Sequence, residues 1–380
     1  MKRNPKVSVI LTSYNHAKYI EDSIKSVLNQ SFNNFELIIW DDCSTDNSWE
    51  IILGFNDPRI RPFRNEYNQS GDSVRRAIEE VAAGQYIAIH HSDDLWESSK
   101  LAKQVKFLDN NENYVAVYTY LKLMCDPGMI FLDHDHPYYD IFDQSNRNRH
   151  EWLRYFFFKG NALCMPSVLF RKSIFQYLNP SYGLYQLPDF SDWVQLCLLG
   201  EIFILPDELT TFRIHKDEEN WSGNKPSTRI RMQFELLKIL DHYKNISSIE
   251  ELLLIFPEAK KFINDDNADI LFALGMIAIE SEKDAQHTLF GLNLLYDALN
   301  DPLRSRNLRI HHGFDKKKFV DLTAKYDIFS YEFIQNLNQI IQKKEQEVLF
   351  YSRSKSWQIT KPLRMMMSLV RKLINRNQLL

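Results

Sequence analysis

The sequence predicts an α/β fold, in which a mostly parallel sheet flanked by helices is followed by a helical C-terminal region. In the first half of the chain, apolar runs typical of buried strands alternate with segments whose apolar residues recur every three or four positions. Beyond Trp221 only the helical spacing continues. The chain has 380 residues, of which 44% are hydrophobic and 25% charged, so it is long enough for a large folded domain and a smaller one.

Strands and helices are expected to alternate from the start of the chain. The run VSVILTS at 7–13 is typical of a buried strand. The helix expected next, at 17–30, places Ile20, Ile24 and Val27 on one face. Strands and helices then follow in turn at 35–42, 44–55, 59–63, 73–84 and 85–90. This alternation predicts parallel strands joined by right-handed crossovers.

Changes in composition suggest three parts of the chain. The first domain is expected over 1–224, with an aromatic-rich extension between about 150 and 215. The turn-rich stretch SGNKPS around Pro226 then marks a junction. A helical domain is expected over 225–350, and a basic amphipathic tail over 351–380.

The tail combines positive charge with apolar side chains. From Arg353 onward it holds seven Lys and Arg residues and no acidic residue, around apolar residues such as Trp357 and Leu363. A basic amphipathic helix of this kind can lie on an anionic membrane surface. A solvated cationic end, or a helix packed on the protein itself, accounts for the pattern equally well.

Charge and cysteine usage narrow the classes of partner and the compartment. The net charge of −4 offers no general attraction for nucleic acid. The four cysteines form no CxxC pair, which favours a reducing compartment over a disulfide framework or a zinc site. The apolar run 7–11 is too short for the core of a signal peptide, and no run is long enough to span a bilayer. We therefore expect a cytoplasmic protein, with any membrane contact peripheral.

Polar segments follow three of the expected strands. They are TSYN at 12–15, DDCSTD at 41–46 and HHSDD at 90–94. Ligands of parallel sheets collect beyond the carboxyl ends of the strands, so these segments should meet at one edge. Adjacent carboxylates such as Asp93 and Asp94 repel each other unless a cation lies nearby, and Mg²⁺ or Mn²⁺ suits oxygen ligands. The alternative is that Ser92 or Asp93 caps a helix beginning near residue 97.

Glycine placement excludes two kinds of nucleotide site. Within the first 100 residues glycine occurs only at 54, 71 and 84, so neither a G-x-G-x-x-G motif nor a P-loop is present there. A dinucleotide or ATP cradle is therefore not expected. The remaining interpretation is a sheet edge whose carboxylates serve a base, a ribose and a metal-bound diphosphate.

Four segments resemble the successive motifs of glycosyltransferase family 2, an inverting family with the GT-A fold. They are VSVILTSYNHAKYIEDSIKSVLNQSF, IIWDDCSTDNS, GDSVRRAIEEVAAGQYIAIHHSDDLW, and PDFSDWVQL with the later LPDELTTFRIH. The resemblance covers about residues 6–222, and the order and spacing of the motifs make it specific. It implies a Rossmann-like GT-A domain, similar to those of bacterial surface-polysaccharide glycosyltransferases.

The resemblance implies a set of nucleotide-binding residues. The set is Thr12, Tyr14, Asn15, Asp41, Asp42, Arg76 and Asp93. The first three would lie beside the base and the ribose, and the next two would recognise the base. The arginine would lie near the diphosphate, and Asp93 would contact the ribose.

The resemblance also implies metal ligands, with one departure from the family pattern. Asp94 and His215 are the implied ligands. The first aspartate of the family's D-x-D motif falls on His91, which either replaces a ligand or closes the strand. We prefer a structural role for this histidine and for His90.

The implied catalytic base is Asp189, the aspartate of the family's ED pair. The glutamate of that pair is Pro188 here, and Asp192 is the alternative base. Arg213, in the FRIH segment, would reach the diphosphate. The aromatic segment 152–158, with GNALCMPSV after it, would choose the acceptor by stacking on sugar rings, although core is the commoner role of a run such as YFFF.

The implied reaction is an inverting single displacement. A carboxylate takes the proton of an acceptor hydroxyl, and a divalent cation (Mn²⁺ or Mg²⁺) neutralises the departing nucleoside diphosphate. The expected donor is a nucleoside-diphosphate sugar, with a UDP-sugar favoured, and the expected acceptor is a glycan or a lipid-linked molecule. Two alternatives remain: a non-catalytic, membrane-associated scaffold with this fold, and a sugar nucleotidyltransferase. The latter would need a Gly-rich basic loop that TSYNHAKYI lacks.

Overall fold

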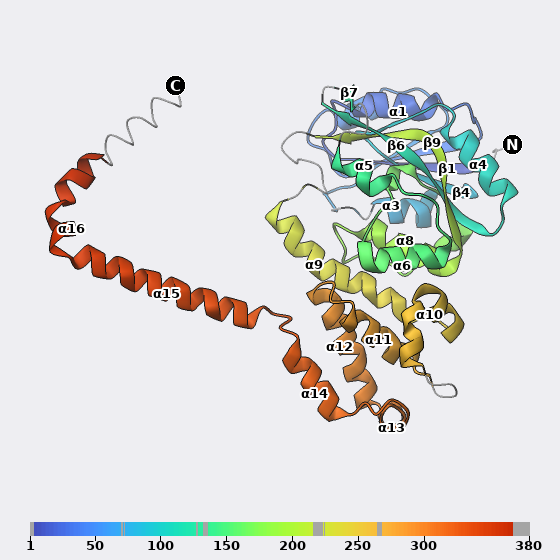
Figure 1. Ribbon diagram of the computed structural model, residues 1–380. Helices are drawn as coiled ribbons and strands as arrows, with labels where there is room; N and C mark the ends of the chain where they lie inside the picture. The colour runs from blue at the N-terminus through green and yellow to red at the C-terminus, as the bar shows by residue number, and fades with distance from the viewer. Residues whose placement is uncertain are drawn as a thin grey trace. The chain divides into compact units, whose positions relative to one another are not determined.

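A computed structural model describes most of the chain (Figure 1). The described residues are 4–69, 71, 73–126, 128–131, 136–215, 223, 225–263 and 268–367. The chain divides into two compact units, Met1–Asp315 and Lys316–Leu380. Each unit is described by itself below.

The first unit is built on a mixed sheet. Among the described residues the strand order is β3-β2-β1-β4-β8-β6-β9-β5, and β7 pairs with β6. The strands are β1 (Val7–Ser13), β2 (Phe35–Asp41), β3 (Ile60–Arg64), β4 (Tyr86–His91), β5 (Leu95–Trp96), β6 (Tyr114–Cys125), β7 (Met129–Ile130), β8 (Leu169–Arg171) and β9 (Glu201–Ile214). From β3 to β4 all pairs are parallel, whereas β8 and β5 run antiparallel to their neighbours. The expected α/β fold is confirmed.

Helices cover both faces of this sheet. They are α1 (Ile20–Leu28), α2 (Ser48–Leu53), α3 (Ser73–Arg76) with the π-helical turn η1 (Ala77–Val81), α4 (Lys100–Asn110), α5 (Pro137–Phe142), α6 (Arg149–Lys159), α7 (Lys172–Phe175) and α8 (Pro188–Leu199). Successive side chains of a strand point to opposite faces. Val9 on β1 accordingly packs in one core with α1 and α4, while Ile10 packs in another with α6 and α8.

The helices that follow the sheet share the second of these cores. They are α9 (Pro226–Leu240), α10 (Ile249–Ile255), α11 (Ile270–Glu280), α12 (Ala285–Asn300) and α13 (Pro302–His311). Leu240 of α9 and Phe156 of α6 belong to one hydrophobic cluster, and Figure 1 shows α9 beneath α8 and α6. The helical C-terminal region is therefore present, and its first five helices belong to the same compact unit as the sheet. The domain boundaries expected after 224 and 350 stay predictions.

Helices α11 and α12 cross at two glycines. A Cβ atom added to Gly291 would lie 2.4 Å from the carbonyl oxygen of Gly275 and 2.7 Å from Cγ1 of Ile279. Real side chains cannot occupy that space, so position 291 requires glycine for the two helices to pack this closely, while a Cβ at Gly275 would be tight, at 3.1 Å from the carbonyl oxygen of Gly291.

The second unit consists of exposed helices. They are α14 (Lys316–Lys325), α15 (Tyr331–Arg353) and α16 (Lys355–Ile359), and none of the three contains a buried residue. The expected tail begins here, but its residues 368–380 lie outside the described part of the chain. Among the described helices, none combines the length and the apolar character that crossing a membrane requires.

Candidate active site

The loops after β1 and β2 are joined by hydrogen bonds at the carboxyl edge of the sheet. The backbone N–H of Asn15 donates to Oγ of Ser44 over 2.9 Å, and Oδ1 of Asn15 accepts from the N–H of Thr45 over 2.7 Å. The N–H of His16 donates to Oγ of Ser48 over 2.9 Å. These contacts bring the segments expected at 12–15 and 41–46 together.

Asp41 and Asp42 are held by protein groups in different ways. The fully buried carboxylate of Asp41 accepts from the N–H and the hydroxyl of Ser44 and lies 3.3 Å from Nε of Arg64. Oδ1 of Asp42 accepts from Nδ2 of Asn65 over 2.7 Å and from the N–H of Gln69 over 2.8 Å. Both aspartates therefore organise loops, and their role at a nucleotide base stays a prediction.

Three other implied nucleotide residues line the same edge. The side chain of Tyr14 is 39% exposed, so its ring has a free face for stacking, and Thr12 beside it is half-buried. Arg76 donates to Oε1 of Gln69 over 2.9 Å, and its guanidinium lies 4.9 Å from the ring centre of Trp40. Arg76 is thus fixed beside the loop that Asp42 holds, and each assigned role stays a prediction.

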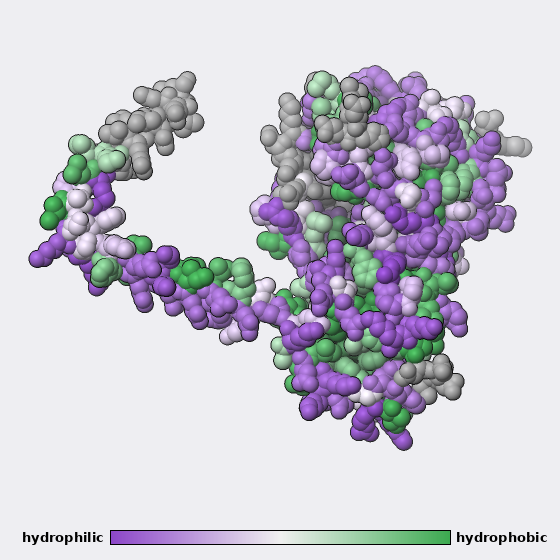
Figure 2. Space-filling model, in the orientation of Figure 1, coloured by the Kyte–Doolittle hydropathy of each residue, from purple (hydrophilic) through white to green (hydrophobic). Residues whose placement is uncertain are grey.

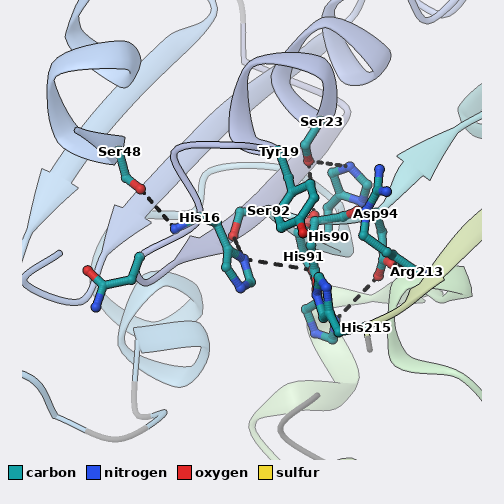
Figure 3. Close-up of polar contacts among 12 residues, drawn as sticks. His16, Tyr19, Ser23, Ser48, His90, His91, Ser92, Asp94, Arg213 and His215 are labelled. Atoms are coloured by element: carbon teal, nitrogen blue, oxygen red, sulfur yellow. Dashed lines mark hydrogen bonds and ion pairs between the residues drawn. The ribbon is translucent and has the colours of Figure 1, made fainter. Parts of the chain in front are cut away.

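The acidic pair, Asp93 and Asp94, follows β4. Oδ1 of Asp94 accepts from the N–H of Arg213 over 2.8 Å, while its other oxygen, Oδ2, is buried without a hydrogen bond and lies 3.6 Å from Nδ1 of His91. Oδ2 of Asp93 accepts from Nε2 of His215 over 2.9 Å. Figure 3 shows His91 and His215 close together beside Asp94 and Arg213.

The two carboxylates of the acidic pair differ in pKa. Burial and the neighbouring charge of Asp93 raise the pKa of Asp94 to about 6. Burial acts in the same direction on Asp93, but the hydrogen bond from His215 and the nearby charges of His16 and His91 outweigh it and lower its pKa to about 2. At neutral pH both groups are therefore mainly anionic, although holding the second charge is costly without a cation.

The acidic pair fits a divalent cation. Donor atoms of His91, Asp93 and Asp94 lie within 4.8 Å of one another, and so do those of His16, Asp93 and His215. Hard divalent cations prefer carboxylate oxygens, and the buried oxygen of Asp94 that accepts no hydrogen bond is such a donor. Asp94 and His215, the ligands implied by the resemblance, thus belong to two groups that share Asp93.

The histidines of β4 have different surroundings. His90 is fully buried, lies 3.0 Å from Oγ of Ser23 through Nε2 and packs against Trp96, with ring centres 4.3 Å apart. These contacts suit the structural role expected for it. His91 instead faces Asp94, so its side chain lies where a ligand would, and the preference for a structural role is not settled by its position.

The alternative that residues 92–93 cap a helix near residue 97 is wrong. The segment continues as β5, and the next helix, α4, begins at Lys100 with Ser99 at its N-cap position. Oγ of Ser92 lies 2.7 Å from Nδ1 of His16 instead. Residues 91–94 of this segment therefore contact one another and the residues of the site rather than a helix terminus.

A network behind the acidic pair was not found from the sequence. Asp126, at the end of β6, accepts from NH1 of Arg213 over 3.2 Å and from the hydroxyl of Tyr19 over 2.9 Å. Nδ1 of His215 lies 3.4 Å from the same carboxylate. Nε of Arg213 also donates to the backbone oxygen of Asp93 over 2.9 Å. Because its guanidinium is committed to these contacts, Arg213 supports the acidic pair in this conformation.

Asp189 lies in the first turn of α8. Oδ1 accepts from the N–H of Phe190 over 2.7 Å, and Oδ2 accepts from Nδ2 of Asn161 over 3.2 Å. Burial raises the pKa of this carboxyl to about 6. Asp189 and the acidic pair both act electrostatically on His91, which places the expected base and the expected cation site in one region.

Asp192, the alternative base, lies one turn further along α8. Its pKa is raised to about 7 by burial and by the charge of Asp189. Carboxyls whose environments separate their pKa values are typical of acid–base sites. At neutral pH Asp189, with the lower pKa, is the more fully deprotonated of the two, and its oxygens are fixed by hydrogen bonds.

The aromatic segment 152–158 is mainly core. Trp152, Phe156 and Phe157 are buried between α6 and the later helices, so the prediction that this run stacks on an acceptor sugar gains no support from them. The following segment does reach the site, since it contains Asn161. The sequence had pointed to the segment GNALCMPSV as a whole, but not to this asparagine.

The architecture of the first unit is a GT-A fold. Two solved structures share it: Staphylococcus aureus TarS 1–349 in complex with UDP (TM-score 0.51, 16% identity, 86% of this chain and 91% of that one) and the mannosyltransferase PcManGT from Pyrobaculum calidifontis in complex with GDP-Man and Mn²⁺ (TM-score 0.50, 15% identity, 88% and 85%). At these identities the likeness shows the fold.

The sequence model "Glycosyl transferase family 2" matches residues 8–178. The chain therefore carries a glycosyl transferase family 2 domain, and the expected resemblance is confirmed. Two similar curated proteins are the UDP-Glc:alpha-D-GlcNAc-diphosphoundecaprenol beta-1,3-glucosyltransferase WfaP of Escherichia coli (35% identity, 30% of this chain and 45% of that protein) and the putative teichuronic acid biosynthesis glycosyltransferase TuaG of Bacillus subtilis (44%, 27% and 42%). The chain thus matches less than half of the length of either relative.

Proposed function

We propose that this protein is an inverting glycosyltransferase that moves a sugar from a nucleoside-diphosphate sugar to a hydroxyl of a glycan or lipid-linked acceptor in bacterial surface-polysaccharide synthesis. The observation that carries the proposal is that Asp189 and the acidic pair all lie within electrostatic reach of His91, in a glycosyl transferase family 2 domain. One group is suited to accept a proton, and the other to hold a cation next to a diphosphate.

Asp189 is the proposed catalytic base. An acceptor hydroxyl is a poor nucleophile until its proton is removed as the new bond forms. With a pKa of about 6, Asp189 is deprotonated at neutral pH yet basic enough to take that proton. Its contacts with the N–H of Phe190 and with Asn161 orient the carboxylate. Attack on the anomeric carbon from one side, with departure from the other, inverts the configuration.

The acidic pair is the proposed cation site, with Mn²⁺ or Mg²⁺ as the ion. Asp94 and Asp93 would hold it, with His91 or His215 completing the set. When bound, such an ion supplies a Lewis acid that neutralises the charge gathering on the leaving diphosphate. The Mn²⁺ in the PcManGT structure supports this assignment. Arg76 contributes a second positive charge on the nucleotide side.

A UDP-sugar is the favoured donor. WfaP uses UDP-Glc by name, and the TarS structure contains UDP. The stacking face of Tyr14 and the loops organised by Asp41 and Asp42 would receive the base and the ribose. The diphosphoundecaprenol in the name of WfaP supports a lipid-linked acceptor. A cytoplasmic location at the inner face of the membrane, with the basic tail on anionic lipid, would bring the enzyme to such an acceptor.

A donor screen tests the proposal. The full chain is incubated with UDP- and GDP-sugars and Mn²⁺, with undecaprenyl-diphosphate-linked sugars as acceptors, and nucleoside diphosphate release is measured. We expect release with one donor class, abolished by EDTA and restored by excess Mn²⁺. Absence of both turnover and metal-dependent nucleotide binding, the latter measured by calorimetry with UDP-sugars and Mn²⁺, would instead favour the scaffold alternative. Diphosphate release from a nucleoside triphosphate and a sugar phosphate would favour the nucleotidyltransferase.

A further inference from the structure

The first turn of α8, which carries Asp189, is held from outside the helix. Leu187 occupies its N-cap position without a side-chain cap, and Pro188 follows. Instead, the carboxylate of Glu235 on α9 accepts three backbone N–H groups, from Tyr185 over 2.9 Å and from Gln186 and Leu187 over 2.8 Å each. Glu235 lies 46 positions after Asp189 in the chain, on another helix. Its carboxylate nevertheless accepts hydrogen bonds from the backbone just before α8, where a neighbouring side chain would usually act as the cap.

Glu235 is a charged group in an unusual place. Its side chain is only 1% exposed. A buried carboxylate is tolerated when hydrogen bonds replace the water it has lost, and charge-assisted bonds to backbone N–H groups are among the stronger ones. The positive end of the α8 dipole adds to this stabilisation. Replacing the carboxylate would leave three backbone donors unsatisfied as well as removing a charge.

The same helical region ties α8 at a second point. Oγ of Ser191 lies 2.8 Å from Nε2 of His242, in the turn after α9, and 2.8 Å from Oγ of Ser181. Glu235 thus holds the backbone before Asp189, up to Leu187, and His242 contacts the side chain of Ser191, two residues after it. Since Oδ1 of Asp189 accepts the N–H of Phe190, the direction of the carboxylate follows the backbone of this turn.

We propose that Glu235 is a positioning residue for Asp189, and that one purpose of the helices after residue 225 is to hold the base in register with the acidic pair. The inference rests on the proposed function, because it assigns Asp189 as the base. Misplacing a reacting group by about 1 Å can cost about 100-fold in rate. The effect is therefore expected in the chemical step and not in nucleotide binding.

The test compares Glu235→Gln and Glu235→Ala with Glu112→Gln, an exposed glutamate outside the site. Glutamine keeps one acceptor oxygen, so it should lower kcat less than alanine, for which we expect a loss of up to about 100-fold. The affinity for UDP in the presence of Mn²⁺ should stay within about twofold of wild type. The pH below which kcat falls, the acidic limb of the pH–rate profile, should change. Unchanged kcat in both variants, or equal losses in kcat and in UDP binding, would refute the positioning role.

Amide hydrogen exchange separates this inference from the proposed function. The amides of residues 185–187 should be protected in wild type and should exchange faster in Glu235→Gln, whether or not a donor has been identified. Wild-type exchange rates in that variant would refute the tie itself. If no donor is turned over while exchange changes as expected, the proposed function fails and the tie between α9 and α8 stands.

A second, independent observation concerns α15. A seam of residues spaced alternately three and four apart runs along this helix: Ile334, Leu337, Ile341, Lys344, Val348 and Tyr351. Its apolar members are between 42% and 65% exposed. Figure 2 shows apolar side chains along one side of the helix and hydrophilic ones along the other. This spacing is the a/d repeat of a coiled coil.

The distribution of charged residues indicates which kind of partner would pack against this seam. Helix α15 carries three acidic and three basic residues, whereas the described segment after it, 354–367, carries three basic residues and no acidic one. An anionic membrane would attract the basic segment 354–367. It would not attract α15, because the charges of this helix cancel. The β-branched residues at positions 334, 341 and 348, with leucine at 337, match the pattern that favours two parallel strands.

We infer that α15 pairs in parallel with α15 of a second copy of this chain. In such a pair a residue at position d packs beside position e of the other helix, which places Lys344 next to Glu345 of the second copy. The only charged side chain in the seam thereby meets an opposite charge. With fewer than three full heptads the pairing is expected to depend on concentration.

Sedimentation of the full chain tests the pairing. Wild type should approach the mass of a dimer as concentration rises, Ile341→Asp should remain monomeric, and Gln342→Asp, on the outward face of the same turn, should match wild type. Lys344→Leu should lower the dissociation constant, by roughly tenfold or more, because a polar residue in the seam costs stability. A monomeric wild type, or an unaffected Ile341→Asp, would overturn the inference. So would a loss of binding to phosphatidylcholine–phosphatidylglycerol vesicles in Ile341→Asp without a change of mass.

Discussion

The acidic pair and the carboxyls of α8 place the same residue type in two different settings. Histidines lie around Asp93 and lower its pKa to about 2, whereas the pKa of Asp94 is raised to about 6. On α8 burial dominates, and the pKa values of Asp189 and Asp192 rise to about 6 and about 7. Asp94 and Asp189 thus have a similar pKa, and the two pairs differ in Asp93, which its histidine neighbours keep anionic. A carboxylate kept anionic suits a cation, whereas carboxyls that titrate near neutrality suit proton transfer.

The largest effect is expected from Asp94→Ala. The variant removes the buried carboxylate oxygen that accepts no hydrogen bond, so metal-dependent nucleotide binding and sugar transfer should both be abolished. Calorimetry with UDP and Mn²⁺ measures the binding. The control is Asp297→Asn, an exposed aspartate of α12, which should bind as wild type does. Wild-type metal-dependent affinity in Asp94→Ala would move the cation away from the acidic pair.

Asp189→Asn should separate chemistry from binding. We expect kcat to fall by about 10²- to 10⁴-fold, the usual contribution of a general base, while UDP binding with Mn²⁺ is kept. Steady-state kinetics and calorimetry on the same preparation check both parts. If this variant keeps its activity and Asp192→Asn loses it, the base role belongs to Asp192.

The pH dependence of kcat distinguishes the two α8 carboxyls. The base works only when deprotonated, so activity should fall as pH drops through about 6 if Asp189 is the base, by about tenfold per unit below that value. With Asp192 as the base the fall would begin near 7. Profiles should be recorded at saturating Mn²⁺, since cation binding to the acidic pair is also linked to protons. A profile flat from pH 5 to 8 would contradict both assignments.

The smallest effect is expected from Asn161→Ala. Loss of the 3.2 Å hydrogen bond to Oδ2 of Asp189 removes a contact that favours the anion, so the acidic limb should move to higher pH, by up to about one unit. Activity at pH 8 should change little. A limb that moves to lower pH would show that this asparagine does not stabilise the charged form.

The fold and part of the site could be predicted from the sequence because their signals are local. Alternating periods of apolar residues predicted the strands and helices, and short motifs pointed to Asp93, Asp94 and Asp189. Residues that act across long sequence distances gave no such signal. Asp126, Asn161 and Glu235 each stand alone in the chain, and only the packing of the sheet and its helices brings them to the site.

The aromatic segment 152–158 shows the opposite difficulty. A run of rings suits both a sugar-stacking surface and a core, and the choice depends on what packs against it. Helices α9 to α12 supply that cover, and they lie outside the family motifs. The sequence could not decide between the two roles because it does not show where those later helices dock.

The crossing of α11 and α12 at the two glycines is connected, through α9, to the turn that carries Asp189. Gln286 of α12 donates to Gln233 of α9, two residues before Glu235 on the same helix. A bulkier residue at 291 would push the two crossing helices apart, and the displacement would pass through α9 to the turn that carries Asp189. If Asp189 is the base, a substitution at this glycine should then lower turnover and leave nucleotide affinity unchanged, although the glycine itself contacts neither group.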